Sequence, residues 1–405
     1  MKEKIVLGLG NNIDYEIVWD SNIFEDLVRK YDIRNAELTP EIEIGSERDL
    51  VISILGFLKS EIGGECFVAD SEILENFAGY FDYRITMGGT SVRAAAAMGR
   101  MGYTSALHMV TLNDHVRRLL PEGCSYVCSA SEEGIYPHLI IQFCQGISVT
   151  ASDIVIRTSR SNRIIYVNDR DNTEMKLNAD LINHVKDCEV FLISGFNAMQ
   201  DKMLLKERLQ TLLGILNELP KDAHVFYEDA CFHNEGFSQE VRDALIQSID
   251  IFSLNEDELQ DYLNRRLNLL DPNAMMQALV DIQKLIPVPH LVVHTRHWAL
   301  AYGDNAQMLR NALKGGITMA GTRFQYGDDY TVENYRETEI QHLQKEGEVF
   351  AAAINHLLGD SVCCLACIQA EETNATTIGL GDAFVGGFLP VLVEWEHREE
   401  TQRVK

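Results

Sequence analysis

Short apolar runs alternate with amphipathic stretches along much of this chain, and that alternation is what most constrains its fold. The apolar runs occupy residues 4–9, 105–110, 189–194, 223–228, 250–255 and 290–295. Stretches between them, such as SVRAAAAMGRMG and NAMMQALVDIQKLI, place apolar residues three and four positions apart, which predicts helices. Strands that are separated by helices are joined by right-handed crossovers and lie parallel. We therefore expect an α/β fold with a doubly wound, mostly parallel sheet.

Two stretches depart from this alternation. Residues 19–85 are rich in charge, and residues 131–175 read as successive strands without an intervening helix. We expect these two segments to form one smaller, β-rich lid domain, because a lid that excludes water favours some reactions. Residues 1–18, 86–130 and 176–405 then form the large nucleotide-binding domain.

The charge balance excludes some classes of partner. The chain has 61 Asp and Glu residues against 35 Lys and Arg, a net charge of -26 over 405 residues. Nucleic-acid binding needs clustered Lys and Arg, so we expect none. The start, MKEKIVLGLGNNID, has only a short apolar run, and no apolar stretch reaches 18 residues, so we expect no signal peptide and no membrane partner. The sequence thus predicts a soluble, cytoplasmic protein that acts on small molecules, with its oligomeric state left open.

The nine cysteines are irregularly spaced, which in a chain of this size is typical of reduced cytosolic thiols. Cys364 and Cys367 form a C-x-x-C pair, the spacing of many metal sites. They lie in SVCCLACIQA, which reads as a buried strand, and the sequence offers no second ligand pair. We expect these thiols to pack in the core as small apolar side chains.

The stretch TTIGLGDAFVGGF, residues 376–388, suggests a catalytic site. Gly379, Leu380 and Gly381 form a Gly-x-Gly turn that leads into Asp382 and an apolar helix. Glycines let backbone N–H groups converge at a helix N-terminus, where the helix dipole also favours an anion. An acid beside such a site suits phosphoryl transfer, because it can accept a hydroxyl proton while the N–H groups stabilise the transferring group. On these residues alone, a glycine turn with a helix-capping aspartate is an equally good interpretation.

Other polar fragments follow predicted strands. Asn255 and Glu258, in SLNEDEL, come at the carboxyl end of a strand, where α/β sheets bind ligands and where a hydrated Mg²⁺ could be held. Asn12 and Asp14, in GNNID, could bind sugar hydroxyls, and the glycines at 88 and 89 could let a sugar approach the backbone. Each fragment alone also fits an ordinary turn or a helix cap.

Taken in order, these fragments resemble the ribokinase superfamily: N-x-D near the start, G-G before an early helix, N-x-x-E in the second half and a late G-x-G-D. Within that superfamily the chain is similar to the ADP-dependent glucokinases and phosphofructokinases. The closer similarity rests on SRSNRII (159–165) followed by DRDN, on the leucine of GLGD and on VHT (293–295). The resemblance runs from residue 10 to residue 388, nearly the whole chain.

The resemblance implies a role for each matching residue. Asp382 would deprotonate the sugar hydroxyl, and the Gly379–Leu380–Gly381 backbone would hold the phosphoryl group. The remaining assignments concern ligands: Asn12, Asp14, Gly88 and Gly89 for the sugar, Arg163 and Arg160 for a phosphate on it, Thr295 for the nucleotide phosphates, and Asn255, Glu258 and Glu228 for the metal shell.

Two positions depart from the family pattern. The ADP-dependent enzymes tend to carry H-x-E on a central strand, whereas FYEDA here keeps Glu228 and puts Phe226 at the histidine position. The helix AFVGGF after Asp382 looks more like that of the ATP-using relatives. We expect a Mg²⁺-dependent, or other divalent-cation-dependent, kinase that transfers a phosphoryl group from ADP to a hexose or hexose phosphate, with fructose 6-phosphate favoured over glucose. An ATP-dependent ribokinase-like kinase for another sugar or a nucleoside, and a non-catalytic regulator that binds sugar or nucleotide, are the alternatives.

Overall fold

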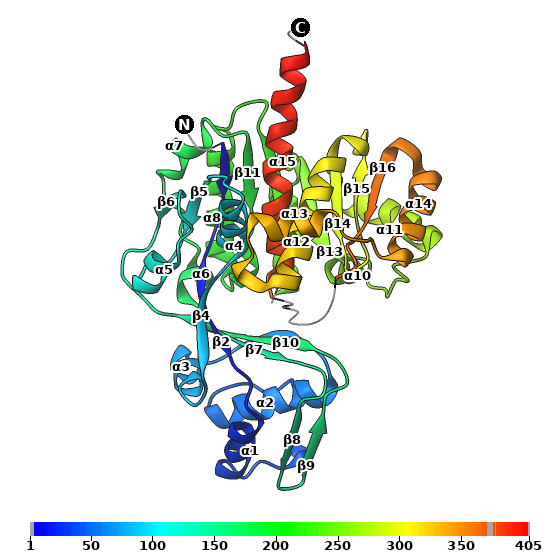
Figure 1. The fold of residues 1–405 in the computed structure, drawn as a ribbon. Helices are drawn as coiled ribbons and strands as arrows, with labels where there is room; N and C mark the ends of the chain where they lie inside the picture. The colour runs from blue at the N-terminus through cyan, green and yellow to red at the C-terminus, as the bar shows by residue number, and fades with distance from the viewer. Residues whose placement is uncertain (1–3, 233, 371–375, 377, 404–405) are drawn as a thin grey trace.

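The computed structural model describes residues 4–232, 234–370, 376 and 378–403, which form two unequal α/β parts joined by extended strands (Figure 1). The described residues of the larger part contain a nine-stranded sheet in the order β16-β15-β14-β13-β12-β11-β1-β5-β6. Its strands are β1 (Ile5–Leu7), β5 (Ala106–Met109), β6 (Ser125–Cys128), β11 (Val190–Ile193), β12 (His224–Glu228), β13 (Ile251–Asn255), β14 (His290–His294), β15 (Trp298–Gly303) and β16 (Val362–Ala366).

Neighbouring strands are parallel from β14 through to β6, while β15 runs antiparallel to both β14 and β16. The expected doubly wound, mostly parallel sheet is confirmed. The six predicted apolar runs coincide with β1, β5, β11, β12, β13 and β14. Chain order reverses between β1 and β11, and such a reversal opens a crevice at the carboxyl ends of the strands.

The described helices are α1 (Ser21–Lys30), α2 (Glu47–Ser60), α3 (Ser71–Ala78), α4 (Thr90–Arg100), α5 (Asp114–Leu119), α6 (Arg170–Glu174), α7 (Leu181–Val185), α8 (Lys202–Leu216), α9 (Glu235–Leu245), α10 (Glu256–Leu263), α11 (Pro272–Leu285), α12 (Arg310–Tyr326), α13 (Val332–Glu339), α14 (Lys345–Leu358) and α15 (Leu380–Arg403). Local signals explain several helix starts. Asp201 caps α8, and Asp271 caps α11 just before Pro272, a residue suited to the first helical turn.

Helices cover both faces of the large sheet because its buried strands are apolar on both sides. Leu192 and Phe226 share one core cluster with residues of α4, α12 and α15, such as Phe388. Phe191 and Tyr227, one position away on the same strands, lie in the cluster formed with α8, α9, α11 and α14. The strand pleat thus alternates side chains between two helical layers.

The smaller part is built on a five-stranded sheet in the order β3-β10-β7-β2-β4. Its strands are β2 (Asn12–Ile17), β3 (Gly64–Phe67), β4 (Tyr83–Gly88), β7 (Pro137–Phe143) and β10 (Asn162–Val167), and β8 (Ser148–Ala151) and β9 (Ile154–Arg157) form a separate hairpin. Residues 19–85 contribute α1, α2 and α3 as well as strands. They contact residues 131–175 directly, for example through the Thr150 amide, which donates to Glu25 at 2.9 Å.

Strands β2 and β4 lead from one part to the other (Figure 1). The chain leaves β1, enters β2 and belongs to the smaller sheet from Asn12 onward, so the expected boundary at residue 18 falls at the end of a strand of that sheet. β4 then returns to the larger part and ends at Gly88, one residue before the cap of α4. The two predicted sugar-binding fragments therefore lie where the two parts meet.

Cys363 and Cys364 are buried in β16, and Cys367, the second cysteine of the C-x-x-C pair, directly follows that strand and is partly buried. All nine cysteines are free thiols. The predicted core strand is thus present for Cys363 and Cys364 but ends before Cys367.

Candidate active site

The glycine turn and Asp382 lie at the start of the C-terminal helix. Gly379 has φ +64°, the left-handed conformation that favours glycine, and α15 begins at the next residue. Gly379 accepts the Ala383 amide at 3.0 Å, which leaves the earlier N–H groups of the turn at the positive end of the helix dipole. Asp382 lies in the first turn of α15 with a fifth of its side chain exposed. Asp382 and the glycine turn thus lie side by side at the positive end of the helix dipole.

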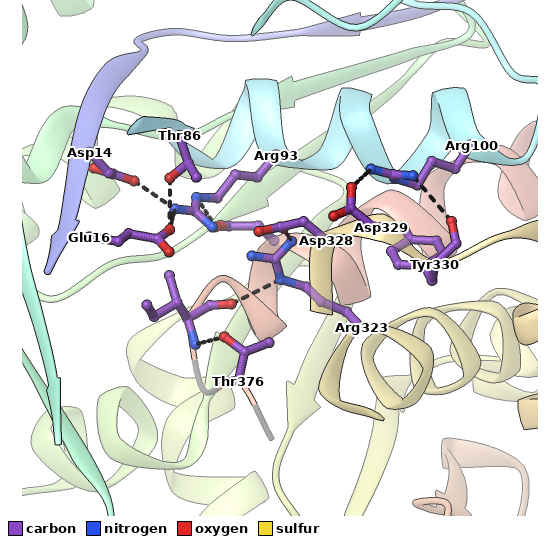
Figure 2. Close-up of polar contacts among 12 residues, drawn as sticks. Asp14, Glu16, Thr86, Arg93, Arg100, Arg323, Asp328, Asp329, Tyr330 and Thr376 are labelled. Carbon is purple, nitrogen blue, oxygen red and sulfur yellow. Dashed lines mark hydrogen bonds and ion pairs between the residues drawn. The ribbon is translucent and has the colours of Figure 1, made fainter. Parts of the chain in front are cut away.

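Arg93 of α4 connects this turn with the smaller sheet, and the sequence reading missed it. Its Nε lies 3.8 Å from Asp382 Oδ2 and its Nη2 lies 2.6 Å from Asp14 Oδ2, although only 8% of the side chain is exposed. A Cβ added to Gly379 would come within 2.8 Å of Arg93 Nη1. Burial disfavours the charge on Arg93, but the carboxylates of Asp14, Asp382 and Glu16 more than offset this and raise its pKa. Figure 2 shows Arg93 pointing from α4 toward Asp14 and Glu16.

The predicted sugar-binding residues come together at the start of β2 and the end of β4. Asn12 pairs with Gly88 in the ladder and donates its side-chain amide to Asp14 at 2.6 Å. A Cβ on Gly88 would lie 2.2 Å from Asn12 Nδ2, so any other residue there would displace the Asn12 side chain. Gly89, at φ +94°, caps α4. Asp14 is 3% exposed, and burial raises its pKa while the charges of Arg93 and His138 oppose that shift.

The two predicted phosphate-binding arginines have different surroundings. Arg160 donates from Nε to the Glu61 carbonyl at 2.8 Å, which ties it to the end of α2. Arg163, on β10, is exposed, and its guanidinium makes no hydrogen bond or ion pair with the residues that the structure describes. Desolvation lowers the pKa of Arg163, and the charge of Asp382, the next largest influence, raises it. Among the described residues, Arg163 is thus a guanidinium of the smaller sheet without a hydrogen-bond or ion-pair partner, and the charge of Asp382 acts on it.

Glu228 lies at the carboxyl end of β12, and its partner is His294 at the end of β14. The distance from His294 Nε2 to Glu228 Oε1 is 3.0 Å, and a Cβ on Gly381 would lie 3.9 Å from the same oxygen. Burial lowers the pKa of His294, but the charge of Glu228 and the bond to it raise the pKa overall. Phe226 is fully buried and packs on Phe388 of α15, with ring centroids 5.3 Å apart. The sequence reading took Thr295 from the VHT segment and passed over this histidine.

Asn255 and Glu258 form a capping box at the start of α10. Asn255 Oδ1 accepts the Glu258 amide at 3.0 Å, and Glu258 accepts the Asn255 amide at 2.8 Å. Glu258 is partly buried, and desolvation followed by the charges of Asp229 and Glu228 raises its pKa well above the usual value. Desolvation similarly raises the pKa of Asp229 to about 7. Three carboxylates thus crowd the carboxyl ends of β12 and β13.

This carboxylate group fits a hydrated divalent cation better than a directly ligated one. Among the described residues, no set of three or more His, Cys, Asp or Glu side chains is arranged to hold a metal ion. Glu228 Oε2 and Asp229 Oδ1 are nevertheless buried without a hydrogen-bond partner. Carboxylate oxygens are the donors that suit Mg²⁺, which keeps several of its waters. A bound cation would give these buried oxygens a partner and would favour the ionised forms of the carboxylates around it.

The Thr295 side chain makes its hydrogen bonds within the turn between β14 and β15. Its hydroxyl donates to the Trp298 carbonyl at 2.9 Å and accepts the amides of His297 and Trp298, each at 3.1 Å. These three hydrogen bonds show that the Thr295 hydroxyl stabilises the turn between β14 and β15. Thr295 lies next to His294, at the same edge of the sheet as Glu228 and Asn255.

The chain matches known proteins over most of its length. The model of the ADP-specific phosphofructokinase/glucokinase conserved region matches residues 3–388. A phosphofructokinase from Pyrococcus horikoshii OT3, solved with AMP, has a TM-score of 0.77 at 17% identity, with 98% of this chain and 99% of that one covered. The last common ancestor of ADP-dependent phosphofructokinases from Methanosarcinales has a TM-score of 0.73 at 16% identity, with 97% and 94% covered.

An ADP-dependent kinase in complex with fructose-6-phosphate and ADPbetaS has a TM-score of 0.72 at 14% identity, with 97% of this chain and 95% of that one covered. No curated protein matches the sequence. None of the described helices is both long and apolar enough to span a membrane. The resemblance inferred from the motifs is confirmed, and with it the expectation of an ADP-dependent sugar kinase: the chain belongs to the ADP-specific phosphofructokinase/glucokinase family.

Proposed function

We propose that the protein transfers a phosphoryl group from ADP to a hydroxyl of fructose 6-phosphate. The observation that carries this proposal is Arg163, an exposed guanidinium without a partner among the described residues that lies within electrostatic range of Asp382. A planar guanidinium can bind a phosphate through two parallel hydrogen bonds. An acceptor with a phosphate of its own would give this cation a partner, whereas a neutral sugar would not.

Asp382 is the proposed base. It accepts the proton of the acceptor hydroxyl as the oxygen attacks phosphorus, while the N–H groups of Gly379, Leu380 and Gly381 stabilise negative charge on the transferring group. Asn12 and Asp14 orient the sugar from the start of β2, and Gly88 and Gly89 leave space beside them. The phosphoryl group is transferred from ADP to the sugar oxygen, and AMP is released.

A divalent cation, Mg²⁺ in the first instance, is the proposed cofactor, and it would supply charge neutralisation between the nucleotide phosphates. Glu228 and Glu258 would hold its waters, with Asn255 completing the shell at the end of β13. Glu228 supports this role best, because its Oε2 has no hydrogen-bond partner in the described structure. Thr295 is proposed near the nucleotide phosphates on position alone, since its hydroxyl is used in a turn.

We also place the activity in cytoplasmic carbohydrate metabolism. The nine free thiols support a reducing compartment, because disulfides form mainly in oxidising ones. Hexose phosphates are intracellular metabolites, so the proposed acceptor agrees with that location.

The deciding experiment pairs each acceptor with each donor. Fructose 6-phosphate, glucose, ribose and a nucleoside are each incubated with ADP or ATP and Mg²⁺, and AMP and ADP formation are measured separately. We expect the highest kcat/KM for fructose 6-phosphate with ADP, and activity that stops when EDTA removes the cation. Preference for glucose would identify a glucokinase, preference for ATP would overturn the choice of donor, and no transfer with any pair would favour a non-catalytic binding protein.

A further inference from the structure

The backbone just before the Gly379 turn is held by a buried arginine of the larger part. Arg323, near the end of α12, donates from Nε to the Ile378 carbonyl at 2.9 Å. Its side chain is only about a tenth exposed, and its Nη1 makes an ion pair with Asp328. A guanidinium bonded on one side to a carbonyl and on the other to a carboxylate has little freedom to rotate. The position of Asp328 therefore affects the backbone that leads into Gly379.

Asp328 is also bound from the smaller part of the molecule. It lies in the 3-10 turn Gly327–Asp329 that follows α12, and its Oδ2 is 3.2 Å from Nη2 of Arg84. Arg84 belongs to β4 of the smaller sheet, where the same Nη2 lies 2.6 Å from Glu16 Oε2 of β2. The Asp328 carboxylate thus pairs with one arginine from each part of the molecule. Figure 2 shows Asp328 lying between Arg323 and Glu16.

Asp328 stays ionised in these surroundings. Burial raises its pKa, but the charges of Arg323, Arg93 and Arg84 outweigh burial and lower the pKa below the usual value. The adjacent Asp329 is different, since it lies 3.5 Å from Arg100 of α4 and makes no ion pair with the described residues of the smaller part, although its charge also raises the pKa of Arg84. Two neighbouring aspartates in one turn therefore give a matched pair, of which only Asp328 forms an ion pair across the junction in the described structure.

We propose that Arg84, Asp328 and Arg323 are positioning residues that couple the seating of the smaller part to the geometry of the Gly379 turn. When β4 is seated, Arg84 holds Asp328, Asp328 holds Arg323, and Arg323 fixes the Ile378 carbonyl. The N–H groups of the turn then point at the phosphoryl group when the sugar site of β2 and β4 is in place. The catalytic consequence rests on the proposed phosphoryl transfer, whereas the mechanical link does not.

The test compares Arg84→Gln, Asp328→Asn, the double variant and the control Asp329→Asn with the wild type. We expect each single variant to lower kcat by about three- to tenfold with a smaller change in KM, and the double variant to lose no more than either single one, since both break the same link. Arg84→Lys should recover part of the loss because it retains the charge. Asp329→Asn should behave like the wild type.

A second readout does not depend on catalysis. Amide hydrogen exchange of residues 378–383 in the unliganded proteins should be faster in Arg84→Gln and Asp328→Asn than in the wild type and in Asp329→Asn. Arg84 is more than half exposed, so Arg84→Gln should remain folded. Unchanged exchange in both cross-junction variants, or losses of kcat that multiply in the double variant, would overturn the link. A wild type that transfers no phosphoryl group would instead refute the proposed function, and exchange would still decide the link.

Discussion

Among single residues, Asp382 has the most specific proposed role, because it places a partly exposed carboxylate directly after the glycine turn. Replacing it with asparagine keeps the shape but removes the ability to accept a proton. We expect Asp382→Asn to reduce kcat by about 10²–10⁴-fold with little change in nucleotide affinity, measured by steady-state kinetics and calorimetry. Turnover close to that of the wild type would mean that Asp382 only caps α15.

Arg163 and Arg160 form a natural comparison, because they lie three positions apart and only Arg160 has a structural partner. We expect Arg163→Ala to raise KM for fructose 6-phosphate by an amount equivalent to about 2–3 kcal/mol, the loss of a charge-assisted hydrogen bond. KM for ADP should hardly change. Arg160→Ala should have a much smaller effect on either constant. If Arg163→Ala and the wild type had equal KM values for fructose 6-phosphate, Arg163 would not bind the phosphate of the acceptor.

The sequence predicts some residues of the site far better than others. Asp382 and Gly379 are recognisable because a glycine turn and its acid are adjacent in the chain. Arg93 could not be found in this way, since its partners Asp14 and Asp382 are 79 residues before it and 289 residues after it. The one signal was an arginine within the otherwise apolar first turns of SVRAAAAMGR. A buried ion pair depends on the tertiary fold, which local patterns do not specify.

At the scale of elements, the buried parallel strands were predictable because each is a continuous apolar run between helices. The smaller sheet was harder, because its strand order brings β10 between β3 and β7, which come from distant parts of the chain. Strand β2 also begins only a few residues after β1. The sequence therefore does not mark where the chain passes from the larger sheet to the smaller one. Residues 19–85 were read as part of a β-rich unit, and their charge hid α1, α2 and α3. The buried faces of α1 and α3 are narrow, whereas residues 50–58 of α2 are all buried.

The contact between α12 and α15 depends on glycine. A Cβ on Gly315 would lie 2.4 Å from the Gly387 carbonyl, whereas a Cβ on Gly214 of α8 would meet nothing within 4 Å. We expect Gly315→Ala to lower the free energy of unfolding by about 1–3 kcal/mol through overpacking. Gly214→Ala should raise it by about 0.5–1 kcal/mol, because alanine is the better helix former. Urea unfolding of both variants measures the difference, and equal values would contradict this close helix packing.

The whole molecule presents an excess of negative charge, yet the junction between its two parts is held by arginines. Arg93 of α4 pairs with Asp14 of β2, and Arg84 of β4 pairs with Asp328 of the larger part. Each part thus contributes an arginine and a carboxylate to the other. The overall charge of -26 was visible in the composition, but the concentration of cations at this junction follows only from the fold.

This junction should weaken in acid. Because the pKa of Asp328 is lowered in the folded protein, its ionised form stabilises the fold above its unfolded pKa of about 4, and that stabilisation is lost as pH falls through the folded value. At pH 7 the wild type should therefore be more stable than Asp328→Asn, and the difference should shrink only below about pH 4. Urea unfolding of both proteins between pH 7 and pH 3 measures this difference, with Asp329→Asn as the control that keeps the junction. A difference that is constant over the whole range would mean that the Asp328 carboxylate does not hold the two parts together.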